Sequence, residues 1–513
     1  MPRRLYWESR TYVGSNQRER YPCLEVSVGL LRRGTRTCSA MKQRRILIIS
    51  LDTVSPSMAG PAIRCWEFAR VLGSLAQVTL AIPNEPALET EGFAQVQYDA
   101  GRLKLLARES DLLILSGHSL WFYPFLKDSE VPIVVDIYDP FLLESLPLLA
   151  GQSDEDQVDR YSIILDALTD LLLWGDFFLC ASEKQRDYWL GWLNALNRIN
   201  PLTYRRSPDL RNLLDVVPFG LPDQPPAKHE PALKGVHPGI SAGDRVILWG
   251  GGVYNWFDPL TLIQAMARVS VQHPDVKLFF LGVDHPTHGD SGSEMVQRAI
   301  ELSRQLDLLD RTVFFNDWVP YQKRQDYLLE ADLGVSLHFA HIETHFSFRT
   351  RLLDYIWASL PMLVTRGDVL SDLVESENLG WVVDFEDLDA VTAAILSGLK
   401  ADRDQYRPRF AAVARSLTWE QVLHPLVAFC QDPRKAADHH FQNRDAHALS
   451  KLKLISLMDA QRRDLSKRDE QIATLKVRIA NLETELEAIK RGRVMRLMSR
   501  VDKLIKGSAR DDD

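Results

Sequence analysis

The sequence lacks the features that mark several classes of protein. None of its apolar runs approaches the roughly 18 to 20 residues that a helix needs to cross a bilayer. Its five cysteines are scattered, and none falls in a CxxC or Cys/His pattern with the spacing of zinc ligands. The net charge of −8 argues against wholesale nucleic-acid binding. These absences indicate a globular protein whose thiols stay reduced in a reducing compartment.

The first 40 residues differ from the rest of the chain. They carry many arginines but no continuous apolar segment, so they do not resemble a secretory signal. Met41 stands immediately before the first clear strand, Arg45–Ser50. We therefore expect the fold to begin at Met41, and residues 1–40 to be disordered or a mis-called N-terminal extension. Acidic residues in this segment make a transit peptide the less favoured interpretation.

The remaining pattern divides into two similar parts. From Met41 onward, short apolar runs alternate with helix-period segments, which is typical of a parallel sheet with helices on both faces. A stretch rich in Pro, Gly and Lys separates the parts at residues 220–244. We expect an α/β protein with a Rossmann-like, doubly wound domain over 41–225, a second over 226–400, and helices packing back on the domains over 401–440. Ligands of such sheets bind beyond the carboxyl ends of the strands, which predicts a cleft between the domains.

The C-terminal region changes character. Apolar residues recur at alternating spacings of four and three across residues 450–490, regularly from Ile472 onward. This heptad pattern predicts a coiled-coil helix that joins copies of the chain, with a single long solvated helix as the alternative. Residues 491–513 place apolar side chains on one helical face and Lys and Arg on the other. Such a basic amphipathic tail predicts contact with an anionic membrane surface, and a frayed end of the coiled coil is equally compatible.

The segment Glu343–Asp368 carries the strongest chemical signal. It follows an apolar strand and is predicted to start a helix near Phe348, with Arg349 and Arg351 in the first turn. Backbone N–H groups and the helix dipole favour anions there, and guanidinium forks match phosphate oxygens. The pattern therefore predicts a diphosphate site that needs no metal. The alternative is a structural network in which these arginines pair with Glu343 and Asp354.

The same segment resembles the donor site of retaining GT-B glycosyltransferases, the family 4-like glycosyl transferases group 1. That family carries a Glu-x7-Glu motif whose second Glu lies seven residues before a proline, and Asp354 lies seven residues before Pro361. The first Glu would fall at Phe346, whereas Glu343 is three residues upstream. The resemblance implies a nucleoside-diphosphate sugar as donor substrate, with no cofactor and no metal. It also implies that Asp354 holds the ribose and Glu343 the sugar ring or its developing positive charge.

Other segments resemble the family in the same order along the chain. SPSMAGPAIRCWEFARVL resembles its glycine-containing loop and first helix, VVPFG the end of its first domain, and WGGGVYNWFDPLTLIQAM the first loop of its donor domain. In that loop Asn255, Trp256 and Asp258 stand where the usual basic residue is missing. The resemblance covers roughly residues 41 to 430 and, besides Asp354, predicts these donor-binding residues: Gly60, Gly251, Gly252 and Asn255.

Polar side chains also follow strands of the first domain. His118, in SGHSLWF, is a candidate catalytic residue, although a solitary loop histidine is more often structural. Asp136 and Asp139, in VVDIYDP, are predicted to bind acceptor hydroxyls or to supply a general base. Their spacing is not DxD, and His338 and His341 are spaced irregularly, so we expect no metal. A hydrogen-bonded sugar pocket, with His338 among the donor-binding residues, is the favoured interpretation.

Together these residues predict a GT-B glycosyltransferase with two Rossmann-like domains and a C-terminal coiled-coil helix. It would move sugar to a glycan or lipid-linked acceptor with retention, in cell-envelope or surface-polysaccharide synthesis, using Glu343, Arg349, Arg351 and His118. We expect a homo-oligomer in the cytoplasm or peripheral on the cytoplasmic membrane face, with no nucleic-acid partner. The alternatives are a non-catalytic GT-B scaffold that oligomerises through its coiled coil, and a nucleotide-sugar epimerase or hydrolase.

Overall fold

The computed structural model describes residues 41–149 except Lys42, 153–283, 294–441, 467–489 except Asp469, and 492–507. They belong to two compact units, Met1–His440 and Phe441–Asp513. The prediction for residues 1–40 falls outside the described residues, as do the parts of the C-terminal predictions that concern 450–466 and 508–513.

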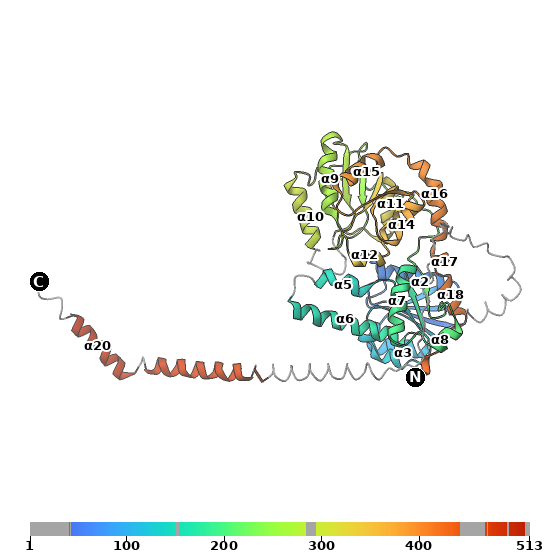
Figure 1. Ribbon diagram of the computed structural model, residues 1–513. Helices are drawn as coiled ribbons and strands as arrows, with labels where there is room; N and C mark the ends of the chain where they lie inside the picture. The colour runs from blue at the N-terminus through green and yellow to red at the C-terminus, as the bar shows by residue number, and fades with distance from the viewer. Residues whose placement is uncertain are drawn as a thin grey trace, which may run out of the picture. The chain divides into compact units, whose positions relative to one another are not determined.

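The first domain is built on a seven-stranded sheet in the order β3-β2-β1-β4-β5-β6-β7, with every neighbouring pair parallel. Figure 1 shows the helices that surround this sheet, among them α2, α3 and α7. Its central strands are continuous runs of buried Val, Ile, Leu and Phe because helices cover both faces. The strands are β1 (Arg45–Ile49), β2 (Gln77–Ile82), β3 (Phe93–Gln97), β4 (Leu112–Ser116), β5 (Ile133–Asp136), β6 (Phe177–Cys180) and β7 (Leu214–Val216). The helices are α2 (Gly60–Gly73), α3 (Ala100–Glu109), α4 (Ser119–Phe122), α5 (Phe141–Leu149), α6 (Asp154–Trp174), α7 (Glu183–Ala195) and α8 (Pro201–Arg206).

The second domain repeats the plan with six parallel strands in the order β10-β9-β8-β11-β12-β13. The strands are β8 (Arg245–Trp249), β9 (Val276–Phe280), β10 (Val313–Phe315), β11 (Leu333–Ser336), β12 (Met362–Thr365) and β13 (Gly380–Val383). The helices are α9 (Pro259–Gln272), α10 (Glu294–Gln305), α11 (Arg324–Glu330), α12 (Ile342–Phe346), α13 (Arg351–Trp357), α14 (Val369–Ser376) and α15 (Leu388–Gly398). Both sheets reverse their strand order next to a central strand, β1 or β8, which is where doubly wound sheets bind ligands.

The chain after the second sheet returns to the first domain. Helix α16 (Arg403–Ser416) packs against α13, and α17 (Trp419–Val422) and α18 (His424–Gln431) pack on the first domain. The fully buried Trp419 lies with its ring centroid 4.8 Å from that of Phe219, and Phe429 stacks on Phe177 at 4.5 Å. These aromatic contacts tie the end of the first unit to the sheet with which it begins.

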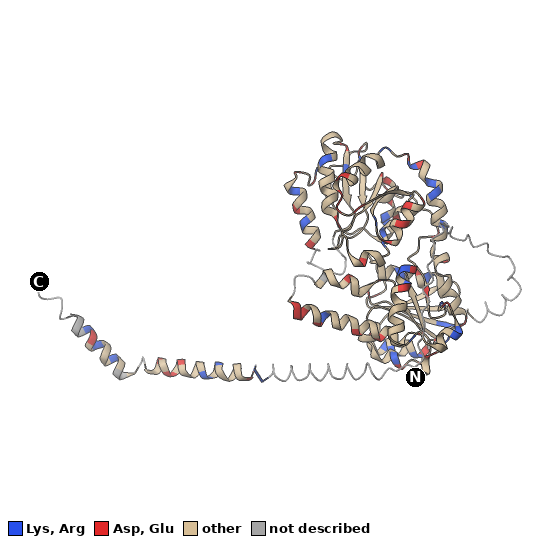
Figure 2. Ribbon diagram, in the orientation of Figure 1, with Lys and Arg blue, Asp and Glu red and all other residues tan. Residues whose placement is uncertain are grey.

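The second unit is helical where the structure describes it. Residues 470–489 form a helix, and α20 (Arg493–Gly507) carries several basic side chains (Figure 2). Among the described residues, none of the helices combines the length and the apolar composition that crossing a membrane requires. The helix itself is present, and its pairing into a coiled coil stays a prediction.

Candidate active site

A cleft of about 390 Å³ is lined by residues of both domains. Its walls come from the segments that follow β1, β5, β8 and β11, near the reversal of strand order in each sheet. The polar and aromatic groups of its lining include Tyr138, Asp139, Glu144, Tyr254, Trp256, Trp318, Tyr321, Arg324, Arg349, Arg351 and Asp354. Of the predicted donor-binding glycines, Gly60, Gly251 and Gly252 lie in this lining. The cleft therefore occupies the place that the parallel-sheet pattern predicts.

Two short helices, rather than one, carry the central segment of the site. Extended backbone at Ser347 ends α12, so the helix predicted to begin near Phe348 begins instead at Arg351. Glu343 lies in α12, where His341 Nδ1 accepts a hydrogen bond from its backbone N–H at 3.1 Å. Arg349 consequently precedes a helix, and Arg351 is the first residue of α13.

Arg349 is held by a buried ion pair. Its Nη2 donates to Glu343 Oε2 at 2.6 Å, and both side chains are almost fully buried. The structural pairing considered as an alternative is thus real for Arg349. Glu343 Oε1 and Arg349 Nε nevertheless have no hydrogen-bond partner among the described residues. Buried polar atoms are nearly always paired in folded proteins, so these two unpaired atoms make the Arg349–Glu343 pair unusual for a purely structural one.

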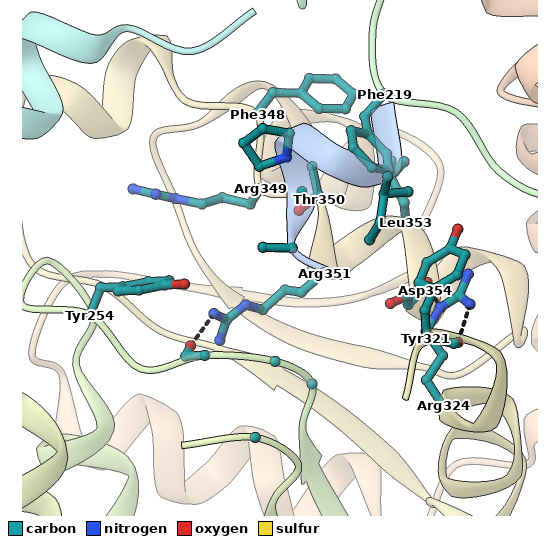
Figure 3. A pocket seen from close by; sticks show the side chains of 18 of the residues that line it. Phe219, Tyr254, Tyr321, Arg324, Phe348, Arg349, Thr350, Arg351, Leu353 and Asp354 are labelled. Atoms are coloured by element: carbon teal, nitrogen blue, oxygen red, sulfur yellow. Dashed lines mark hydrogen bonds and ion pairs between the residues drawn. The ribbon is translucent and has the colours of Figure 1, made fainter. Parts of the chain in front are cut away.

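Arg351 has no carboxylate partner among the described residues. Its Nη2 donates to the carbonyl oxygen of Gly252 at 2.6 Å, while its Nη1 is buried without a hydrogen bond. The guanidinium lies over the Phe257 ring at 4.0 Å and the Trp249 ring at 4.8 Å. Burial lowers the pKa of Arg351 to about 10, so the group remains cationic near neutral pH. Figure 3 shows its guanidinium and that of Arg349 extending to the same side of the cleft, beside Tyr254.

Asp354 lies at the other side of the cleft, with Arg324 (Figure 3). Its Oδ1 accepts from Arg324 Nε at 2.9 Å, and the Arg324 guanidinium stacks 3.6 Å above the Tyr321 ring and 4.8 Å from Trp357. Asp354 is therefore fixed in place, with a third of its side chain still exposed. Sequence reasoning missed Arg324 because nothing in the segment YQKRQDY distinguishes it from its basic neighbour Lys323.

The first domain contributes one of its two predicted carboxylates to the cleft. Asp139 lines it, whereas Asp136 is buried against Arg64, with contacts of 2.6 and 2.9 Å, and is not in the lining. Arg64 also donates to the carbonyl oxygens of Val217 and Pro218, so this pair braces the domain. Asp136 therefore has a structural role, in place of the predicted contact with acceptor hydroxyls. Glu144, in the first turn of α5, also lines the cleft, and burial raises its pKa well above the ordinary value.

Four further predicted residues do not line the cleft, and the first of them is Glu343, which is fully buried in its pair with Arg349. His118 occupies the N-cap position of α4 without a side-chain capping hydrogen bond, its ring lies 6.2 Å from that of Phe122, and burial lowers the pKa of its imidazole. His338 is buried with its Nε2 3.3 Å from Asp368, and Asn255 accepts a hydrogen bond from the backbone of Met295. Asn255 lies between the lining residues Tyr254 and Trp256 in sequence, and the side chains of His338 and Asn255 are both engaged within the second domain.

Comparison with known proteins agrees with this geometry. Residues 244–401 match the model of the family described as Glycosyl transferases group 1. The second domain is a group 1 glycosyltransferase domain. No curated protein sequence matches the chain.

Solved structures extend the likeness of this glycosyltransferase to both domains. Sucrose-phosphate synthase from Thermosynechococcus elongatus is 16% identical with a TM-score of 0.53, covering 75% of this chain and 98% of that one. HepE of Anabaena in complex with UDP-glucose is 14% identical with a TM-score of 0.51, and the match covers 75% of this chain and 99% of that one. A glycosyltransferase from Rickettsia africae is 14% identical with a TM-score of 0.51, and the match covers 76% of this chain and 98% of that one. At these identities the likeness shows the fold, and the predicted GT-B architecture is confirmed.

Asp139 gives the glycosyltransferase a testable pH dependence. Burial raises the pKa of this carboxyl to about 7, so the folded chain keeps a proton that the unfolded chain loses at the ordinary, lower pKa. The contribution of Asp139 to stability must therefore fall as pH rises from the ordinary pKa of the carboxyl to its raised pKa. The fall is at most about 1.4 kcal/mol per pH unit and levels off above about pH 7. Asp139→Asn should gain stability relative to wild type between about pH 5 and about pH 8, measured by denaturant unfolding.

Asp111→Asn is the control of opposite sign, because hydrogen bonding from Arg45 lowers the pKa of Asp111. That contribution is present at neutral pH and is lost as pH falls through the lowered pKa. A stability difference between Asp139→Asn and wild type that stays constant with pH would contradict the assignment.

Proposed function

We propose that this glycosyltransferase takes its sugar from a nucleoside-diphosphate sugar bound in the cleft between its domains. The observation that carries the proposal is Arg351, a cation among aromatic rings with no carboxylate partner in the described part of the chain. A charge taken out of water is costly unless an opposite charge joins it. Arg349, two residues away and with an unpartnered Nε, supplies a second guanidinium, and two such forks match the oxygens of a diphosphate.

The chemistry follows from this arrangement. As the bond between sugar and diphosphate breaks, negative charge grows on the leaving group, and prepositioned guanidinium groups stabilise it without a metal. Asp354 would hold the ribose, and Glu343, which is buried outside the cleft lining, would orient Arg349. Asp139 and Glu144, on the opposite wall, would meet the acceptor. The complex of the structurally similar HepE with UDP-glucose supports a nucleotide-sugar donor.

The finer assignments are proposals of the same kind. They comprise retention at the anomeric carbon, a glycan or lipid-linked acceptor, and a role in cell-envelope or surface-polysaccharide synthesis. We also propose that the chain acts in the cytoplasm as a homo-oligomer joined through residues 450–490. Its basic tail would contact the anionic cytoplasmic face of a membrane.

A ligand screen tests the proposal. Thermal unfolding is measured with UDP-, GDP-, ADP- and dTDP-sugars for wild type and for the double variant Arg349→Ala/Arg351→Ala. One donor class should raise the midpoint of wild type by several degrees and leave the double variant unmoved. Arg366→Ala, which removes an exposed arginine paired with Asp384, is the matched control and should respond like wild type. A folded wild type that responds to no donor would favour the non-catalytic scaffold.

Gln185 is expected to position the donor site from the other domain. Its side chain is fully buried: Oε1 accepts from the Ala181 N–H at 2.8 Å, and Nε2 donates to the carbonyl oxygen of Phe346 at 2.9 Å. Phe346 ends α12, the helix that carries Glu343, and the Tyr188 ring lies 5.0 Å from its own. Gln185→Leu should lower kcat/KM about tenfold, since small displacements of a reacting group are costly.

The control for this contact is Lys184→Met. Lys184 joins Asp372 across the same pair of domains, but the pair is exposed to solvent, and such pairs contribute little. Steady-state kinetics should separate the two variants. Equal losses in both, or a Gln185→Leu defect seen only in the unfolding midpoint, would contradict a positioning role.

A further inference from the structure

The helix at residues 470–489 has an apolar stripe that the described part of the chain does not cover. Its members are between 49% and 62% exposed. They are Ile472, Leu475, Ile479, Leu482, Leu486 and Ile489. Their spacings alternate between three and four residues, which places them on one side of a helix. A stripe of this length left in water would cost free energy that a second helix could recover by packing against it.

We propose that residues 470–489 pair with a second copy of this chain as a parallel, in-register, two-stranded coiled coil. The proposal sharpens the oligomer proposed above and does not depend on sugar transfer. The order of side chains in the first two heptads matches that of parallel two-stranded coiled coils. Ile472 and Ile479 occupy the a positions of the first two heptads and Leu475 and Leu482 the d positions, whereas the third heptad reverses the order, with Leu486 at a and Ile489 at d. β-Branched residues at a with leucine at d favour two parallel strands.

Charges beside the stripe agree with pairing between identical chains. Arg478 takes a g position and Glu483 the following e position, so a parallel pair joins Arg478 of each copy to Glu483 of the other. An antiparallel pair would also join opposite charges, Arg478 to Glu485. The charges therefore support self-association in general, and the Ile and Leu order of the first two heptads is the one that parallel two-stranded coiled coils use.

Parallel pairing has a consequence for α20, which begins four residues after Ile489. In a parallel pair both copies of α20 leave the coiled coil at the same end. Each displays exposed Leu497, Met498 and Val501 together with Arg496 and Arg500. Two linked weak sites on one surface bind with an avidity about 10²- to 10⁴-fold above a single site. The coiled coil would thus convert a marginal membrane contact of each tail into a stable bivalent one.

Disulfide trapping in the full chain tests the direction. Ile472 of one copy meets Ile472 of the other in a parallel pair and Ile489 in an antiparallel pair. Ile472→Cys alone should therefore give a covalent dimer on mild oxidation, seen on a non-reducing gel. Wild type is the background control, and its described cysteines, Cys65, Cys180 and Cys430, are buried. A dimer that forms only when Ile472→Cys is mixed with Ile489→Cys, or no dimer in a chain that sediments as a monomer, would overturn the proposal.

Vesicle flotation tests the consequence. Full-length protein is mixed with phosphatidylcholine vesicles with or without phosphatidylserine. Leu475→Asp/Leu482→Asp breaks the stripe without changing α20 and should weaken binding to the anionic vesicles at least about tenfold. Ala473→Asp/Ala480→Asp adds the same charge on the outer face and should bind like wild type. Equal binding by both double variants would contradict the bivalent arrangement. The thermal shift with donor should be unchanged in both, which keeps this test separate from that of the active site.

Discussion

Replacing Arg351 with methionine is expected to lower kcat/KM for sugar transfer by about 10²- to 10³-fold, the loss typical of removing one prepositioned charge-stabilising donor. Methionine preserves the apolar contacts with Trp249 and Phe257 but cannot meet a phosphate oxygen. The unfolding midpoint should not fall along with the activity, because the change removes a buried cation that has no carboxylate partner in the described structure. Activity and stability should therefore separate in this variant.

The controls for Arg351→Met use the same chemistry. Arg351→Lys keeps the charge but loses the planar fork, so it should recover only part of the activity. Arg366→Met removes an exposed arginine and should leave both kinetics and unfolding near wild type. Full turnover by Arg351→Met under first-order conditions would contradict the assigned role of this guanidinium.

Arg64→Met is expected to lower the free energy of unfolding by about 3–5 kcal/mol, the usual result of stripping one partner from a buried ion pair. The Arg64 guanidinium is completely buried and neutralises Asp136 while satisfying two carbonyl oxygens at the end of the first domain. Without it the carboxylate stays buried with no counter-charge. Burial already raises the pKa of Asp136, so the variant should also be more stable in mild acid than at neutral pH.

Denaturant unfolding measures this loss, and two variants control it. Arg45→Met breaks an exposed pair with Asp111 and should leave the midpoint near that of wild type. Arg64→Met/Asp136→Leu removes both charges and should recover much of the lost stability, because an apolar replacement of a buried pair is often tolerated. If the double variant is no more stable than Arg64→Met, the contacts of Arg64 with the carbonyl oxygens contribute more to stability than the charge pair.

Most of the two sheets was predictable because their strands are buried on both faces and appear as continuous apolar runs. The edge strand β3 was missed, since its FAQVQ sequence is only partly buried and gives no such run. The start of α13 was misplaced because the backbone break at Ser347 has no glycine or proline to mark it. Arg349, Arg351 and Asp354 do line the cleft, and the sequence pointed to them through the anion-binding start of a helix after a strand and through the spacing of Asp354 to Pro361.

The remaining site residues depend on partners far away in the sequence. A carboxylate after a strand looks the same whether it faces a cleft or a neighbouring helix, and Asp136 faces Arg64, 72 residues upstream. Asn255 and His338 are likewise turned to partners within the second domain. Glu144 and Arg324 lie in segments without any motif, so that only the folded structure shows them at the cleft.

Titration calorimetry with a nucleoside, its monophosphate and its diphosphate tests the central claim most directly. The base is the one that the ligand screen identifies, and the proteins are wild type and Arg349→Ala/Arg351→Ala. The account predicts that wild type binds the diphosphate at least about 10²-fold more tightly than the nucleoside, since charge-assisted hydrogen bonds contribute about 1.5–3 kcal/mol each. The double variant should bind the diphosphate and the nucleoside with similar affinity. Equal affinities in wild type would contradict the claim that these two arginines form a diphosphate site.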